Sequence, residues 1–140
     1  MLTTTTRCAA WFRHCVHRLN EMPDLVRRIL EDLEEMGYSP KERFGIRLAL
    51  EEALVNAVKH GNRCDESKMV RVRYQATEAQ FMVEIEDEGQ GFSRADLPDC
   101  ADSENLERPC GRGVALMEHY MTTVRYNDRG NCVQMIKSRS

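Results

Sequence analysis

The chain has 140 residues, 41% of them hydrophobic, a length and apolar content that suit one compact domain with its own core. Its 20 Lys and Arg against 23 Asp and Glu give a net charge of −3, so it lacks the strong positive field expected of a duplex-DNA-binding protein. Six cysteines without a C-x-x-C pair, no secretory signal and no long apolar run predict reduced thiols in a cytoplasmic protein that does not enter a membrane.

The N-terminal region is predicted to contain one strand followed by a helix. The polar, Thr-rich residues 1–6 are expected to be a loose end, and residues 7–17 to form an edge strand. After Pro23, apolar residues recur at helical spacing, and Gly37 ends the run.

A second, longer helix is predicted from Pro40 to about His60. Ser39 is its expected N-cap, because a serine oxygen accepts from the first free N–H groups, and proline suits the first helical position. The Gly-Asn pair at 61–62 is its expected C-terminal stop.

The second half of the chain changes to strand periodicity. Residues 70–75 and 81–86 each alternate apolar and polar side chains, which predicts a hairpin with one wet face. Residues 88–110 have little apolar periodicity and are predicted to be a long loop, of the kind that is either a functional lid or a disordered segment. A short helix is expected after Gly113.

Two further strands complete the predicted fold. They are expected near 123–127 and 132–137, joined by a turn at 128–131. The result is a single α+β domain, a two-layer α/β sandwich in which helices cover one face of a mostly antiparallel sheet.

The long helix carries an unusual row of small and polar residues. Its apolar stripe (Leu50, Leu54, Ala57 and Val58) is ordinary core. A separate row, one turn apart, contains Gly45, Ala49, Glu52, Asn56 and His60. Small residues followed by Glu, Asn and His would suit a ligand lying along this face; the alternative is a solvated helix face.

Asp87 stands at the end of a strand, on the side expected to be buried. A desolvated carboxylate needs a partner, which would be either a backbone N–H in the next turn or a donor on a ligand. Gly89 and Gly91 follow it, and glycine allows the backbone to approach a ligand closely.

A glycine-bearing segment precedes the predicted short helix. Gly111 and Gly113 would place backbone N–H groups at a helix N-terminus, which suits phosphate oxygens. Arg108 and Arg112 lie beside them and could contact a phosphate. The spacing matches neither a P-loop nor a Rossmann fingerprint.

Three motifs occur in a fixed order: EALVNAVKHG at 52–61, DEGQGF at 87–92 and GRGVALM at 111–117. Together they resemble the N box and the two glycine boxes of the GHKL ATPases, the superfamily of gyrase and histidine kinases, whose domain is the Bergerat type of α/β sandwich. Within it, the short chain and the EALVN and GRGxxLM forms look most like the anti-sigma-factor serine/threonine kinases.

The resemblance implies a role for each matching residue. Asn56 would coordinate Mg²⁺ bridging the phosphates of ATP, and Glu52 would act as general base on the attacking hydroxyl. Asp87 would accept from the adenine amino group, with Gly89 and Gly91 framing the adenine pocket.

Around the phosphates, the resemblance implies a lid formed by residues 88–110. Gly111 and Gly113 would bring lid backbone to the phosphates, with Arg108, beside Arg112, as a partner of the terminal phosphate. His60 would either cap the helix end or touch the ligand.

The resemblance implies a kinase that phosphorylates a small anti-sigma-factor antagonist and alternately sequesters a sigma factor. Kinases of this group often form homodimers through the N-terminal region. Two alternatives stay open: an ATP-gated interaction module without significant phosphotransfer, and the catalytic half of a histidine kinase, for which His14 and His17 are the only early histidines.

Overall fold

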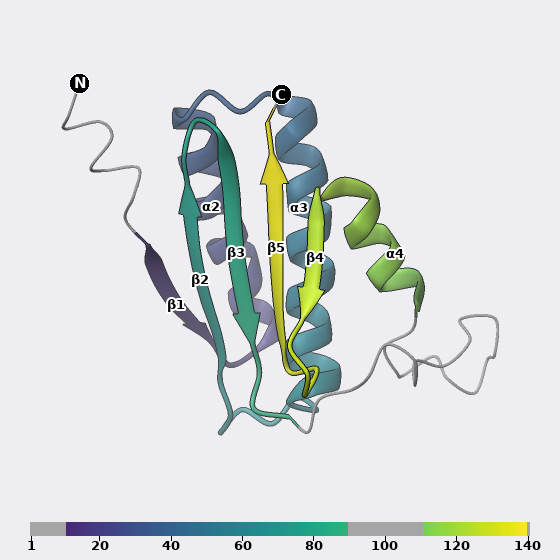
Figure 1. Ribbon diagram of the computed structural model, residues 1–140. Helices are drawn as coiled ribbons and strands as arrows, with labels where there is room; N and C mark the ends of the chain where they lie inside the picture. Colours follow the sequence, from purple (N-terminus) through teal and green to yellow (C-terminus); the bar gives the residue numbers. More distant parts are fainter. Residues whose placement is uncertain (1–10, 90–110, 140) are drawn as a thin grey trace.

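The protein is an antiparallel five-stranded sheet with its two longest helices on one face (Figure 1). The computed structural model describes residues 11–89 and 111–139. The strand order is β1-β2-β3-β5-β4. The strands are β1 (Phe12–Val16), β2 (Val70–Ala76), β3 (Gln80–Glu86), β4 (Thr123–Tyr126) and β5 (Cys132–Ser138).

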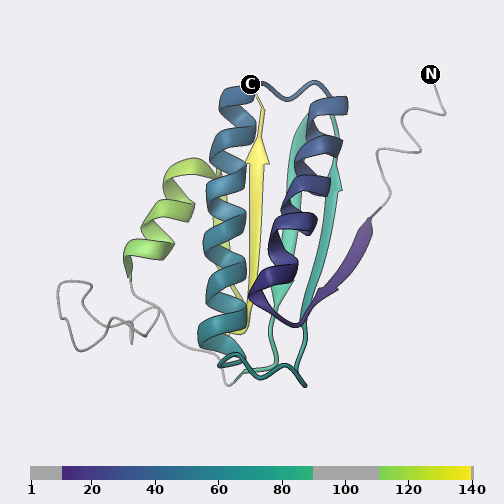
Figure 2. The ribbon, with the colours of Figure 1, turned by 180° about the vertical axis from the view of Figure 1, so that it is seen from behind.

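Helical segments form the second layer. The three α-helices are α2 (Met22–Glu35), α3 (Pro40–Val55) and α4 (Gly111–Tyr120). A 3₁₀ turn, η1 (Leu19–Glu21), leads into α2, and a π-helical segment, η2 (Asn56–Gly61), continues α3. Seen from behind, α2 and α3 cover the face of the sheet and run roughly along its strands, and α4 lies beside α3 (Figure 2). The α+β two-layer prediction is therefore confirmed.

The core lies between the sheet and the helices, as the two periodicities predict. Alternate residues of the central strands face the helices and are almost completely buried, among them Val72, Tyr74, Phe81 and Val83. The opposite face is polar: Arg73 and Glu84 form an ion pair of 2.9 Å across β2 and β3. The predicted hairpin and its wet face are confirmed.

Local signals set the boundaries of the first two helices. Gly37 has φ +89°, a left-handed conformation that glycine adopts without a steric penalty, and it follows the end of α2. Ser39 caps α3, because its Oγ accepts from the Glu42 N–H at 3.1 Å while the Glu42 carboxylate accepts from the Ser39 N–H at 2.8 Å. Both boundaries were predicted.

The end of the long helix differs from the prediction. From Asn56 the α-helix widens into η2, and the Asn62 N–H donates to the Ala57 carbonyl five residues back, at 2.8 Å. The helical path still stops at Gly61 with Asn62 as its C-cap, as predicted, and the left-handed residues Arg63 and Cys64 follow, with φ of 54° and 59°. A locally wider turn leaves no signature in apolar spacing, so a regular helix was expected.

The small residues at the start of the predicted ligand row serve helix packing instead. Gly45 faces α4, where a Cβ would lie 2.7 Å from Cδ1 of Tyr120, and Ala49 is completely buried. For these two residues neither alternative, a ligand or a solvated face, holds, because both pack inside the protein. The short helix also begins at Gly111, so both glycines of the GRG segment lie in its first turn rather than before it.

The capping box at Ser39 predicts a measurable loss of stability. We expect Ser39→Ala to lower the free energy of unfolding by about 1 kcal/mol, because the Glu42 N–H loses its acceptor. This corresponds to roughly 3 to 5 °C in Tm for a domain of this size. Ser39→Asn keeps a capping oxygen and should stay within a few tenths of a kcal/mol of the parent, as measured by denaturant unfolding. Equal losses in the two variants would contradict the capping role.

Candidate functional site

The predicted site residues that the structure describes lie on α3 and η2, at the end of β3 and in the first turn of α4. Glu52 belongs to α3, and its carboxylate lies against Gly113 in the first turn of α4. A Cβ at position 113 would overlap Oε1 of Glu52 and would lie 3.1 Å from its Cδ. The carboxylate thus lies in the space beside Gly113, and two motifs that are distant in the sequence meet here.

Asn56 and His60 follow Glu52 along the same continuous helical path. Asn56 is the first residue of η2, and both side chains are half-buried. A π-helical turn takes more residues than an α-helical one, so His60 is rotated relative to Asn56 from the position that a regular helix would give it. The structure therefore keeps Glu52 and Asn56 one α-helical turn apart and changes the placement of His60.

Asp87 directly follows β3 and is about half-buried. Its Oδ1 accepts from the Gly89 N–H at 2.8 Å. This is the backbone partner in the next turn that was one of the two predicted alternatives. Its Oδ2 lies against Gly61 at the end of η2, where any Cβ would overlap the carboxylate. Burial raises the pKa of Asp87 to about 6, against the lowering effects of the Gly89 hydrogen bond and of Arg129.

Gly89 makes the closest backbone approach of the site. A Cβ on Gly89 would overlap the Gly61 carbonyl oxygen and would lie 2.7 Å from its carbon and 2.9 Å from Oδ1 of Asp87. The prediction placed Gly89 against a ligand. The structure places it against the backbone of η2, so this glycine joins the two halves of the site.

Three residues around Asp87 were missed by sequence reasoning as site residues. Asn62 is buried, and its Oδ1 accepts from the Glu88 N–H at 2.8 Å. Asn131 and Arg129, in the turn between β4 and β5, contact the backbone of Asp87 and Gly89. The available signals were that Asn62 stands directly after the glycine that ends the long helix and that Asn131 stands directly before a strand.

Several predicted features lie outside the described residues. They are Gly91, Arg108, the side chain of Arg112 and the loop at 90–110. Among residues 11–89 and 111–139, no group of three or more His, Cys, Asp or Glu side chains is placed to hold a metal ion by itself. In the same part of the chain, no helix has the length and apolar character needed to cross a bilayer.

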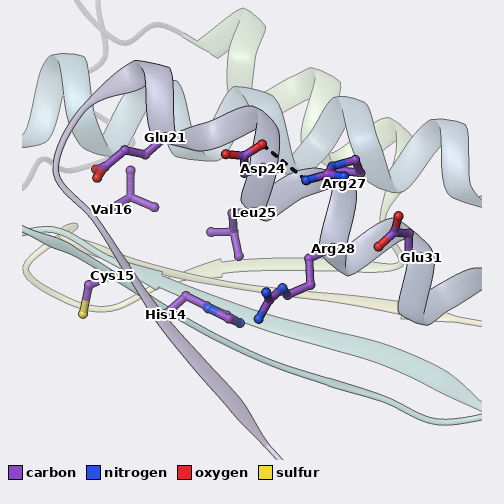
Figure 3. Close-up of a pocket in the computed structure, with 9 residues that line it drawn as sticks. All are labelled: His14, Cys15, Val16, Glu21, Asp24, Leu25, Arg27, Arg28 and Glu31. Carbon is purple, nitrogen blue, oxygen red and sulfur yellow. Dashed lines mark hydrogen bonds and ion pairs between the residues drawn. The ribbon is translucent and has the colours of Figure 1, made fainter.

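A separate hollow of about 530 Å³ lies between β1 and α2 (Figure 3). His14 and Arg28 approach each other in it, and the His14 ring stacks on Tyr74. None of the predicted nucleotide-site residues lines it. The other early histidine, His17, is positioned by the Lys68 carbonyl, 3.1 Å from its Nδ1. Both early histidines therefore have structural contacts away from Glu52.

The burial of Asp87 predicts an unusual pH dependence. Its pKa is about 6 in the folded protein against an ordinary 3.8, so between these values the folded state holds a proton that the unfolded chain has released. The free energy of unfolding contributed by this group therefore falls as pH rises from about 4 to about 6.

Asp87→Asn should accordingly stabilise the protein at pH 7, by on the order of 1 kcal/mol after allowance for solvent screening of a half-exposed group. The gain should nearly vanish at about pH 4, where the parent carboxyl is protonated. Urea unfolding at both pH values measures this, with Asp128→Asn in the exposed β4–β5 turn as control. A destabilised Asp87→Asn variant at pH 7 would contradict the burial argument.

Comparisons with known proteins identify the family of this chain. Residues 16–137 match the family described as Histidine kinase-like ATPase domain. The anti-sigma F factor of Clostridium perfringens strain SM101 is 31% identical over 103 residues, covering 71% of this chain and 73% of the relative. The serine-protein kinase RsbW of Bacillus subtilis is 33% identical over 109 residues, 73% of this chain and 68% of the relative. The serine/threonine-protein kinase BtrW of Bordetella bronchiseptica is 29% identical over 94 residues, covering 66% of each chain. The chain thus belongs to the histidine kinase-like ATPase domain family, and it is similar over most of its length to bacterial anti-sigma factors and serine kinases.

Proposed function

We propose that this chain is an ATP-dependent serine/threonine kinase that acts as an anti-sigma factor in the cytoplasm. It phosphorylates a small antagonist protein and, alternately, holds a sigma factor. The family is one of ATP-binding domains, and the similar proteins carry both names, anti-sigma factor and serine-protein kinase. The observation that carries the proposal is the Glu52 carboxylate at the first turn of α4, one turn before Asn56.

The base of ATP would bind at the Asp87 end of the site. The ionised Asp87 carboxylate accepts a hydrogen bond from the exocyclic amino group of adenine, an interaction that an oxygen at that ring position could not make. The Gly61–Gly89 contact holds the carboxylate in place. Gly91 would frame the same pocket, as the family resemblance implies. Because the proton must be off Asp87, we expect ATP affinity to fall as pH drops below about 6.

The phosphates would extend along η2 and α3 toward α4. Gly111 and Gly113 stand in the first turn of α4, where backbone N–H groups would face phosphate oxygens. Arg108 and Arg112 would add positive charge there. In this proposal residues 88–110 form the lid of a single nucleotide-binding domain. His60, which lies between the two ends of the site, would stabilise the helix end or touch the ribose and phosphates.

Phosphoryl transfer asks the protein for positioning and charge neutralisation. Glu52 takes the proton of the serine or threonine hydroxyl as its oxygen bonds to the terminal phosphorus, and the bond to ADP breaks. The amide oxygen of Asn56 would hold Mg²⁺, an ion that prefers oxygen ligands. When bound, Mg²⁺ neutralises charge on the phosphates.

A homodimer through the N-terminal region is part of the same proposal. Its structural support is that β1 is an edge strand whose Phe12 side chain is half-exposed.

Glu52→Gln is the sharpest test of the kinase assignment. We expect phosphotransfer to a co-encoded antagonist to fall by about 100-fold or more, because the variant cannot accept the proton. ATP affinity should change little. The measurements are phosphoserine or phosphothreonine on the antagonist and nucleotide binding by calorimetry. Glu51→Gln, the adjacent residue of α3, is the matched control.

Tight ATP binding by the parent without transfer to any antagonist would instead favour an ATP-gated interaction module. An acid-labile phosphohistidine would favour the histidine kinase alternative.

Asn56→Ala tests the proposed Mg²⁺ ligand. Mg²⁺ should strengthen ATP binding by the parent protein, and this enhancement should drop by about tenfold in the variant, corresponding to roughly 1.4 kcal/mol. Affinity measured in excess chelator should be similar in both proteins. Asn20→Ala, at an exposed asparagine in η1, is the control. An unchanged Mg²⁺ enhancement in Asn56→Ala would remove Asn56 from the metal site.

A further inference from the structure

The turn between β4 and β5 is built around two asparagines. The Asn127 side-chain oxygen accepts from the N–H groups of Gly130 at 2.8 Å and Asn131 at 3.0 Å. Gly130 has φ +82°, which a residue with a side chain adopts only under strain. These contacts close the turn without any help from Asp87 or Gly89.

Asn131 nevertheless reaches out of the turn and holds the backbone of Asp87 on both sides. Its carbonyl accepts from the Asp87 N–H at 2.8 Å, and its side-chain amide donates to the Asp87 carbonyl at 3.1 Å. Its own Oδ1 accepts from the Asn127 amide at 2.8 Å, which fixes the orientation of the Asn131 amide. Asn131 is only 8% exposed. Asn131 thus hydrogen-bonds to both the N–H and the carbonyl of Asp87.

Arg129, in the same turn, holds the next part of this segment. Its Nη2 donates to the Gly89 carbonyl at 3.0 Å. Arg129 is otherwise exposed, so burial contributes little to holding its guanidinium in position. The hydrogen bond to Gly89 is what positions it. Its positive charge acts on Asp87, where it favours the ionised carboxylate.

We propose that the β4–β5 turn is the positioning element for base recognition, with Asn131 and Arg129 setting nucleotide affinity and the preference for ATP over GTP by holding Asp87 and Gly89. The proposal rests on the proposed ATP site. Neither residue is catalytic; both act through the backbone of the segment that carries the recognising carboxylate.

The geometry explains why the segment needs this support. Asp87 lies just past the last ladder residue of β3, where a strand would otherwise leave its carbonyl without a partner. A carboxylate that selects one hydrogen-bond donor must be held to within a few tenths of an ångström, which requires an anchored backbone. The turn supplies that anchor because it leads directly into β5, the strand that pairs with β3.

The charged groups around Asp87 make the inference testable by pH. Arg129 and Lys68 favour its ionised form, whereas Glu86 disfavours it. Of the two cations, Arg129 has the larger effect on the pKa of Asp87. Removing the Arg129 charge should therefore move the pH at which ATP affinity is lost to a higher value.

The experiment compares Arg129→Gln, Asn131→Ala and the parent, with Arg125→Gln on β4 as matched control. Affinities for ATP and GTP are measured from about pH 5 to about pH 8, and amide hydrogen exchange at residues 87–89 is measured without nucleotide. The exchange measurement does not depend on ATP binding, so it separates failure of this inference from failure of the proposed function.

We expect Arg129→Gln to bind ATP about 3- to 10-fold more weakly at pH 7, to discriminate less against GTP and to lose affinity at a higher pH than the parent. Asn131→Ala should show faster exchange at Asp87 and a similar loss of discrimination. Arg125→Gln should match the parent throughout.

A parent-like pH profile and ATP/GTP ratio in Arg129→Gln would overturn the role of Arg129. Unchanged exchange at Asp87 in Asn131→Ala would overturn that of Asn131. If the parent binds no nucleotide, the proposed function fails, and the role of the turn in selectivity fails with it. The exchange measurement would still show whether Asn131 holds the backbone of Asp87.

Discussion

The contact of Gly61 and Gly89 around the Asp87 carboxylate is the constraint on which the site depends. It brings the end of η2 against the segment after β3, with no room for a Cβ on either glycine. Because the backbones meet so closely, the carboxylate is partly desolvated and its pKa rises to about 6. The protein gives up stability here to keep an acceptor in a fixed place, as functional sites commonly do.

Local periodicity was enough to predict most of the fold. Alternation in residues 70–75 and 81–86 identified both central strands and the face that each buries, because a period of two leaves no other arrangement with one wet side. Ser39 and Gly37 marked helix boundaries because their effects act within one turn. Asp87 drew attention for a related reason: a carboxylate in phase with Phe81 and Ile85 has to be accounted for.

What the sequence did not reveal depends on partners that are distant along the chain. Gly45 and Ala49 looked like a surface for a ligand, yet Tyr120 of α4 occupies the space beside Gly45. A small residue indicates that something approaches closely, and it does not say whether a ring, a backbone or a ligand does so. Asn131 escaped notice for the same reason, because asparagine is common in turns and its second contact is 44 residues away.

The two halves of the site share one helical path, and this makes the π-helical segment important. Glu52 and Gly113 meet at its α-helical part, whereas Gly61, Asp87 and Gly89 meet at its far end. The wider turn between them changes the rotation of Gly61 about the helix axis relative to Glu52. One helical path therefore contacts α4 at one end and the end of β3 at the other, with the wider turn between the two contacts.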